Sequence, residues 1–273
     1  MAYPKLLTIQ DISCVGQCSL TVALPIISAC GIETCVLPSA VLSTHTAGFS
    51  GYTFRDLTED MPAINAHWKK ENICFDAIYT GYLGSTKQID YVLEIAASTK
   101  QGLMIVDPAM ADNGKLYPGF DMAFVEAMKG LCAQADYVVP NLTEAAFLTG
   151  LAYQTSYDRA YIDQMLEKLC ALGCKNVILT GVSYREGKTG IVVLENGSYA
   201  YYEHDFLPNS CHGTGDIYAS AFVGALVRGK CAYDAARIAA DYTVACIERT
   251  AQEENHWYGA AFEPVLHKLI DAL

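Results

Sequence analysis

Short apolar runs alternate with amphipathic stretches along the chain, and this alternation limits the possible folds more than any other feature. Runs rich in aliphatic and aromatic residues predict strands over 5–12, 33–42, 75–83, 102–108, 136–140 and 176–181. Helical periodicity predicts helices over 18–30, 62–71, 86–100, 143–150, 157–172, 217–227, 233–249 and 262–273. Strands that alternate with helices favour a mostly parallel central sheet covered on both faces, which is a three-layer α/β/α sandwich.

Two segments depart from the alternation. Residues 190–194 and 198–204 alternate around Asn196-Gly197, which is a strong signal for a hairpin and predicts an antiparallel edge of the sheet. Residues 43–56 are polar, glycine-rich and aromatic without a clear period, and they predict a loop or flap. Because no linker or change of composition divides the chain, we expect a single domain over residues 1–273.

Composition excludes several classes of protein. Hydrophobic residues make up 52% of the chain, which argues against disorder, and the net charge of -12 argues against a nucleic-acid partner. No run approaches the roughly 18 apolar residues that span a bilayer, and the first ten residues lack the pattern of a signal peptide. The 11 scattered cysteines are typical of reduced thiols, so we expect a cytoplasmic protein without membrane association.

The most informative motif is Gly213-Thr214-Gly215-Asp216, which directly precedes a helix rich in small residues. Glycines let a backbone approach a ligand closely, and successive N–H groups at a helix start form an anion site. Asp216 in the first turn is suited to accept a proton from an attacking hydroxyl, and the helix dipole is expected to keep it ionised. A loop-to-helix joint without a ligand is an equally good interpretation of these residues alone.

Two acidic segments follow predicted strand ends. Asn141 and Glu144 lie three positions apart and can face one point, as a metal ion would require, although a helix cap explains the same spacing. Asp107 stands at the end of a buried strand, where α/β sheets place ligands, and Asp112 follows in the next loop. A buried carboxylate without a partner is unfavourable, which favours a functional Asp107.

Together these motifs resemble the ribokinase-like superfamily and, within it, the pyridoxal/pyridoxamine (vitamin B6) kinases. The resemblance covers nearly the whole chain. Gly213-Thr214-Gly215 resembles the family's anion hole, with Asp216 as its catalytic base. Asn141-Leu142-Thr143-Glu144 is similar to its Asn-x-x-Glu motif for metal and phosphate. Thr80-Gly81-Tyr82, Asp107-Pro108 and Ser43-Thr44-His45-Thr46 are similar to segments of B6 kinases in particular.

The resemblance assigns further roles. Ser13 resembles the serine that meets the substrate ring, and Thr46 and Tyr82 would line the same pocket. Asp112, Asn141 and Thr180 resemble residues that lie near the ATP phosphates. The same likeness implies that Glu144, Asn141 and Asp107 hold Mg²⁺.

The resemblance implies an ATP-dependent kinase that phosphorylates the hydroxymethyl group of pyridoxal, pyridoxamine or pyridoxine. It implies Mg²⁺ with ATP as co-substrate, leaves a K⁺ ion open, and implies a homodimer. Related kinases act on hydroxymethylpyrimidine in thiamine synthesis and often carry cysteine at the position of Asp216, so the aspartate favours the B6 activity.

A non-catalytic vitamin- or nucleotide-binding protein on the same fold stays open, although a binder needs no base. A nicotinamide-dependent oxidoreductase would need Gly-x-Gly-x-x-Gly after the first strand, and residues 12–20 do not supply it.

Overall fold

A nine-stranded sheet forms the centre of the molecule in the computed structural model, which describes residues 3–208 and 211–273. The strand order is β11-β10-β9-β8-β5-β4-β1-β2-β3. The strands of this sheet are β1 (Lys5–Ser13), β2 (Glu33–Leu42), β3 (Phe54–Asp56), β4 (Phe75–Thr80), β5 (Lys100–Val106), β8 (Tyr137–Val138), β9 (Val177–Val182), β10 (Lys188–Glu195) and β11 (Ser198–Asp205). Neighbours from β2 to β9 pair in parallel, which confirms the predicted mostly parallel sheet.

Both edges of the sheet are antiparallel, whereas the sequence indicated only one such edge. The hairpin of β10 and β11 turns at Asn196-Gly197 as predicted, and both turn residues have positive φ. At the other edge β3 pairs antiparallel with β2 through Leu42 and Phe54. The expected flap over 43–56 therefore ends in a strand, so its C-terminal end is tied to the sheet.

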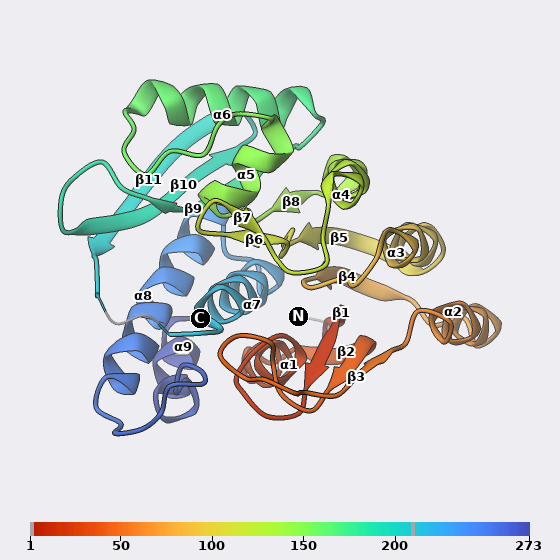
Figure 1. Cartoon of the computed structure of the whole chain (residues 1–273). Helices are drawn as coiled ribbons and strands as arrows, with labels where there is room; N and C mark the ends of the chain where they lie inside the picture. The colour runs from red at the N-terminus through yellow and green to blue at the C-terminus, as the bar shows by residue number, and fades with distance from the viewer. Residues whose placement is uncertain (1–2, 209–210) are drawn as a thin grey trace.

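Helices cover both faces of the sheet and complete the three layers (Figure 1). One face carries α1, α7, α8 and α9, and the other carries α2 to α6. The helices are α1 (Leu20–Ala29), α2 (Met61–Lys70), α3 (Thr86–Thr99), α4 (Met122–Gln134), α5 (Leu142–Thr149), α6 (Arg159–Ala171), α7 (Thr214–Val227), α8 (Ala232–Thr250) and α9 (Leu266–Ala272), with a 3-10 turn at Glu263–Val265 before α9. Within the described residues, no helix combines the length and apolar character needed to cross a bilayer.

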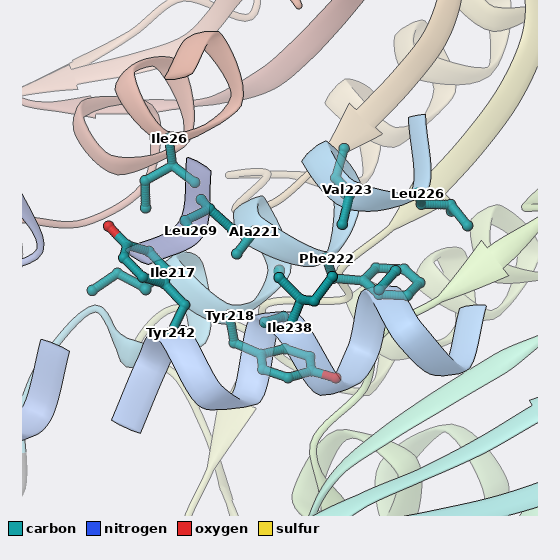
Figure 2. Close-up of a cluster of buried hydrophobic side chains, with 14 of the residues drawn as sticks. Ile26, Ile217, Tyr218, Ala221, Phe222, Val223, Leu226, Ile238, Tyr242 and Leu269 are labelled. Carbon is teal, nitrogen blue, oxygen red and sulfur yellow. The ribbon is translucent and has the colours of Figure 1, made fainter. Parts of the chain in front are cut away.

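Helix α7 is buried on all sides because it packs between the sheet, α1 and α8. Every residue from Ile217 to Leu226 is buried, and Figure 2 shows side chains of α7 in one cluster with Ile26 of α1, Ile238 of α8 and Leu269 of α9. A helix that is apolar all round requires such an interior position. Its N-terminus is thereby held firmly against the carboxyl end of the sheet, where the Gly213-to-Asp216 motif lies.

Helix α4 was absent from the sequence prediction. Asp121 caps it by accepting a hydrogen bond from the backbone N–H of Phe124 at 3.0 Å. The parallel strands β5 and β8 require a crossover connection, and α4 supplies it. Its apolar face packs in the same core as α3 and α5.

The loop before α4 contains a small second sheet of β6 (Ala111–Asp112) and β7 (Lys115–Leu116). Asn113 and Gly114 form its turn, and both have positive φ, as a tight hairpin turn requires. The sequence analysis placed Asp112 in a loop here and predicted neither strand.

Candidate active site

The candidate site residues gather at the carboxyl edge of the sheet, on either side of the place where the strand order reverses. Strand β1 pairs with β2 on one side and with β4 on the other, so the reversal lies at β1. Open α/β sheets bind ligands at such a point. Ser13 ends β1, Tyr82 lies two residues after β4, and Asp107 directly follows β5. Ser13 and Tyr82, which the resemblance assigned to one pocket, and Asp107 therefore lie at the ends of neighbouring strands.

The turn before α7 is built for close approach of a ligand. Gly213 is the N-cap residue of α7 with φ of 80°, and a Cβ there would overlap the backbone carbonyl oxygen of Gln17. Among the residues that the structure describes, no side chain caps this N-terminus, so the first N–H groups of α7 can meet a ligand or water. Thr214 and Gly215 are the first two residues of the helix, and the side of Gly215 is open. Such a helix start can bind an anion, and the anion hole at these residues stays a prediction.

Asp216 lies in the first turn of α7 beside this cradle. Its side chain is half-buried, so a ligand can reach it while protein surrounds most of it. Burial raises the pKa of Asp216 to about 7, a backbone hydrogen bond at Ser19 opposes the rise, and the charge of Asp11 adds to it. The expectation that the helix dipole keeps Asp216 fully ionised is therefore wrong, because desolvation outweighs it.

Asp11 is a second carboxylate in this region, and sequence reasoning missed it. It is 5% exposed, and its Oδ2 accepts a hydrogen bond from Ser13 Oγ at 3.0 Å. Burial raises the pKa of Asp11, while hydrogen bonds with the side chains of Ser19 and Ser13 and with the backbone of Asp11 lower it. Ser13, the predicted ring contact, thus points toward a buried carboxylate.

The flap over 43–56 is anchored by His45 and an aromatic contact. His45 Nε2 lies 2.5 Å from the backbone oxygen of Tyr258, and the N–H of Ala47 donates to His45 Nδ1 at 3.2 Å. These two bonds require the neutral ring with its proton on Nε2. Phe49 packs on Trp257 with ring centroids 4.7 Å apart. The predicted pocket residue Thr46 follows His45 and is exposed.

Tyr82 borders the same region from the β4 side. Burial raises the pKa of Tyr82 to about 12, and the charge of Asp11 contributes next. Its ring lies 5.4 Å from that of Phe120. The predicted substrate residues Ser13 and Tyr82 therefore both lie near Asp11, which in turn lies within electrostatic range of Asp216.

Asn141 and Glu144 form a complete helix cap at the start of α5. The side chain of Asn141 accepts from the backbone N–H groups of Thr143 and Glu144, and Glu144 accepts in return from the N–H of Asn141 at 2.9 Å. The other oxygen of Glu144 accepts from Met110 N at 3.2 Å. Both carboxylate oxygens of Glu144 thus hold backbone groups, and the residue is 2% exposed. Burial raises the pKa of Glu144 to about 7.

The remaining predicted phosphate and metal residues surround this cap. Thr180 of β9 forms a bridge with Asn141, and Asn141 Nδ2 donates to the backbone oxygen of Ala111 at 2.9 Å. Asp112 is exposed and accepts from the backbone and side chain of Asn113, so it stabilises its own turn. The structure therefore brings Thr180 to Asn141 directly and places Asp112 at the rim.

Asp107 is a buried carboxylate with one side-chain hydrogen bond among the described residues. It is 8% exposed, and Oδ1 accepts from Ala109 N at 3.2 Å. Burial raises the pKa of Asp107 well above its ordinary value, and the charges of Glu144 and Asp216 raise it further. A cation between these carboxylates would relieve their mutual repulsion.

The residues present fit Mg²⁺ that arrives with ATP better than a metal held by the protein alone. Within residues 3–208 and 211–273, no group of three or more His, Cys, Asp or Glu side chains is arranged to hold a metal ion. Mg²⁺ in nucleotide sites needs one or two carboxylates, with phosphates and water as the other ligands. Asp107 offers such a carboxylate. Both carboxylate oxygens of Glu144 already accept hydrogen bonds from backbone N–H groups.

Tyr117 is another residue of the site that the sequence did not indicate. It lies within electrostatic range of Glu144, Asp107, Asp216 and Asp112, and burial raises its pKa. It follows β7 and donates its backbone N–H to Met110 O at 2.8 Å. The hairpin of β6 and β7 brings it to the site, and that hairpin was not predicted.

Glu144 allows a test that separates its cap from a role in metal binding. We expect Glu144→Gln to raise the Mg²⁺ concentration for half-maximal activity several-fold, because a neutral amide neither attracts a cation nor accepts both N–H groups. Loss of the cap alone should lower stability by about 1 kcal/mol. Asp121→Ala, which removes the cap of α4, is the matched control and should leave the Mg²⁺ dependence of initial rates unchanged. An unchanged Mg²⁺ dependence in Glu144→Gln would leave only the helix cap.

Comparison with known families places the chain among small-molecule kinases. The profile of a family described as phosphomethylpyrimidine kinase matches residues 24–261. A pyridoxal kinase of Dictyostelium discoideum is 28% identical over 244 residues, which cover 82% of this chain and 79% of that protein.

Two solved structures share the fold over nearly the full length. A pyridoxal kinase from Lactobacillus plantarum is 33% identical with a TM-score of 0.92, and the match covers 99% of this chain and 98% of that one. A candidate phosphomethylpyrimidine kinase from Bacteroides thetaiotaomicron, crystallised with pyridoxal, is 37% identical with a TM-score of 0.91, covering 98% and 96%. The architecture seen here, including the antiparallel edges, is thus the ribokinase-like fold.

Proposed function

Because the chain belongs to the phosphomethylpyrimidine kinase family, and is therefore a phosphotransferase with an alcohol acceptor, we propose that it transfers phosphate from ATP to the hydroxymethyl group of a vitamin B6 vitamer. The observation that carries the proposal is Asp216 at the uncapped start of α7, within electrostatic range of Asp11 and Asp107. This arrangement provides a base, an anion cradle and two flanking acidic sites in one place.

The proposed reaction uses the first turn of α7 directly. Asp216 accepts the proton of the hydroxymethyl group as the hydroxymethyl oxygen attacks the γ-phosphorus of ATP, the bond from the γ-phosphorus to the β,γ-bridging oxygen breaks, and ADP leaves. A base with a pKa near 7 is suited to this step, because a large fraction is ionised at neutral pH and proton transfer stays favourable. The backbone N–H groups that follow Gly213 stabilise charge on the transferred phosphoryl group. The flap over 43–56 excludes water, which would otherwise be phosphorylated.

The acidic residues beyond β5 and β8 form the proposed nucleotide side. Asp107 would bind Mg²⁺, and Asn141 and Thr180 would lie by the phosphates, with Asp112 at the rim. Bound Mg²⁺ would neutralise the charge of the ATP phosphates. Glu144 fixes the loop that carries Asp107 and Met110 to the start of α5. A K⁺ ion would join the same acidic region.

The preference for B6 rests on the aspartate at position 216 and on the relatives, several of which are pyridoxal kinases. The alternative acceptor is hydroxymethylpyrimidine or its phosphate, and the family profile favours it. ATP turnover with pyridoxal, pyridoxamine, pyridoxine and hydroxymethylpyrimidine tests the proposal. We expect the B6 vitamers to have the higher kcat/KM. A higher value for hydroxymethylpyrimidine would reassign the substrate, and no turnover with any of them would indicate a binding protein.

Ser13 should matter more for the acceptor than for the nucleotide. Its hydroxyl donates to the buried Asp11 at the end of β1, whereas the proposed phosphate residues lie at β6, at the start of α5 and in β9. We expect Ser13→Ala to weaken vitamer binding several-fold and to change ATP binding little, as measured by calorimetry of each ligand. Thr8→Ser, a change at another buried hydroxyl of β1, serves as the control. Equal losses for both ligands would remove Ser13 from the acceptor site.

A homodimer belongs to the proposal as well. Exposed apolar side chains lie on α1, β2 and β3 at one edge of the sheet, namely Leu24, Val36 and Phe54. Light scattering after size-exclusion chromatography measures the mass directly. A monomeric mass at micromolar concentration would contradict the dimer.

A further inference from the structure

Gln17 lies in the loop between β1 and α1, and its side chain bonds to residues near the other end of the chain. Its Nε2 donates to both carboxylate oxygens of Glu263 at 3.2 Å, and its Oε1 lies 3.0 Å from Nε2 of His256. Because an amide oxygen only accepts, this bond requires the His256 ring with its proton on Nε2. A flipped amide would turn its oxygen toward the carboxylate, so one orientation of the Gln17 side chain satisfies both partners.

Both partners belong to residues 251–265, which join α8 to α9 and are called the C-terminal connection below. This connection is itself fixed to α8, because Ala261 donates its N–H to Thr250 Oγ1 at 2.8 Å. It also lies close to the loop before α1, since a Cβ on Gly259 would lie 2.5 Å from Gln17 Oε1. The side chain of Gln17 is therefore held by a segment that has its own support in the fold.

The backbone of Gln17 contacts the turn that forms the proposed anion cradle. A Cβ on Gly213 would overlap the carbonyl oxygen of Gln17, so the turn before α7 rests directly on this loop. The place of Gln17 consequently sets the place of the first N–H groups of α7. A misplacement of about 1 Å in a catalytic site can lower a rate by about 10²-fold.

The flap is held by the same C-terminal connection. His45 Nε2 lies 2.5 Å from the backbone oxygen of Tyr258. Phe49 packs on Trp257 with ring centroids 4.7 Å apart. The flap and the loop before α1 also meet directly, because a Cβ on Gly16 would overlap the ring of His45. One segment thus supports both the flap and, through Gln17, the turn before α7.

We propose that Gln17 is a positioning residue for phosphoryl transfer, because its side chain fixes the anion cradle to the C-terminal connection that also holds the flap. The inference rests on the proposed function, since it takes the turn before α7 as the cradle for the transferred phosphoryl group. Gln17 acts through its contact with Gly213 and is not itself a contact of the reacting atoms. The alternative is that Gln17 only stabilises the loop, in which case its loss lowers stability without changing turnover by the folded enzyme.

Gln17→Ala separates these two interpretations when rates are measured well below its melting temperature. We expect kcat to fall by at least about 10-fold, because the cradle would lose its fixed position. The KM values for ATP and for the acceptor should change little, because the cradle stabilises charge that develops in the transition state. A kcat equal to that of the wild type would leave only the structural role.

Asn176→Ala is the matched control, because its amide also bridges two segments. Asn176 is half-buried like Gln17, donates to the backbone oxygen of Asp136 at 2.8 Å and accepts from the N–H of Asn196 at 3.0 Å. It precedes β9, at the edge of the sheet opposite the candidate site. We expect Asn176→Ala to lower the melting temperature about as much as Gln17→Ala and to leave kcat unchanged.

A double-mutant cycle with Glu263 tests whether Gln17 acts through the C-terminal connection. Glu263→Ala should also lower kcat, and the double variant should be no slower than Gln17→Ala, because the two residues share one contact. Effects that multiply in the double variant would overturn the proposed tie. If Gln17→Ala does not fold, His256→Ala removes one partner and keeps Gln17 itself. We expect a fall in kcat there as well, and an unchanged kcat would overturn the proposal.

The wild type distinguishes a failure of this inference from a failure of the proposed function. Turnover by the wild type, together with a kcat of Gln17→Ala equal to that of Asn176→Ala, would overturn the role of Gln17 alone. No turnover by the wild type with any B6 vitamer or with hydroxymethylpyrimidine would overturn the proposed function, and with it the role of Gln17.

Discussion

Asp216→Asn is expected to lower turnover by at least about 10²-fold while the affinities for ATP and vitamer stay close to those of the wild type. The asparagine keeps the size of the side chain and most of its hydrogen bonds but cannot accept the proton of the acceptor hydroxyl. General-base catalysis typically contributes about 10²–10⁴-fold. Steady-state kinetics with calorimetric binding of both ligands checks the result. Near-normal turnover would show that Asp216 serves only the start of α7.

The pH profile gives an independent check on the same residue. Because the pKa of Asp216 is raised to about 7, the base is lost as the pH falls through 7. We expect kcat/KM of the wild type to fall about tenfold per pH unit on the acidic side. The residual activity of Asp216→Asn should lack this limb. An acidic limb shared by both proteins would assign it to another group, and Asp107 and Glu144 are the candidates.

Stability should change in the opposite direction from activity. The pKa of Asp216 rises from 3.8 to about 7 on folding, so the folded state resists ionisation and the wild type loses stability as the pH rises through this window. Asparagine does not titrate. The melting temperature of Asp216→Asn relative to the wild type should therefore increase from about pH 4 to pH 7 and then level off. A proposed catalytic base that destabilises its own fold fits the general exchange of stability for function.

The layered fold could be predicted from the sequence, because each strand and helix has a pattern that is visible in a short stretch of the chain. The motif that ends in Asp216 could also be found in the sequence, because its glycines and the aspartate lie within four consecutive residues. Helix α4 was not predicted, although Phe124, Val125, Met128 and Leu131 follow a helical period, and no element was assigned between the loop at Asp112 and the strand at 136–140. Strand β3 is only three residues long and depends on β2 for its pairing, so no local pattern reveals it.

The place of Asp11 in the site and the raised pKa of Asp216 could not be predicted from the sequence, because both depend on contacts between residues far apart in the chain. Asp11 has neighbours at positions 45, 82 and 216, which meet only after β1, β4 and α7 pack together. Burial raises the pKa of Asp216. The local sequence indicated only the helix dipole, which would lower that pKa. A helix cap and a metal site would both place a glutamate three residues after Asn141, so the sequence alone does not distinguish the two roles of Glu144. The hydrogen bonds of Glu144 with Asn141 and Met110 show that the cap is formed.

Among glycine-to-alanine changes in the site, we expect Gly213→Ala to cause the largest loss of turnover. Gly213 has φ of 80°, where an L side chain costs roughly 1–2 kcal/mol. The added Cβ would also overlap the backbone oxygen of Gln17, so the turn must move away from the loop between β1 and α1. Such a shift would misplace the N–H groups of the anion cradle. Loss of one such donor typically lowers turnover by about 10²–10³-fold.

Gly197→Ala separates strain from displacement. Gly197 has φ of 76° in the turn between β10 and β11, and nothing lies within 4 Å of its added Cβ. Both variants therefore carry the left-handed strain, and only Gly213→Ala carries the overlap with Gln17. We expect Gly197→Ala to lose about 1 kcal/mol of stability in urea unfolding and to retain its activity. Gly213→Ala should lose more stability and at least about 10²-fold in kcat. If the two variants matched in both measurements, the close contact between Gly213 and Gln17 would not be what positions the anion cradle.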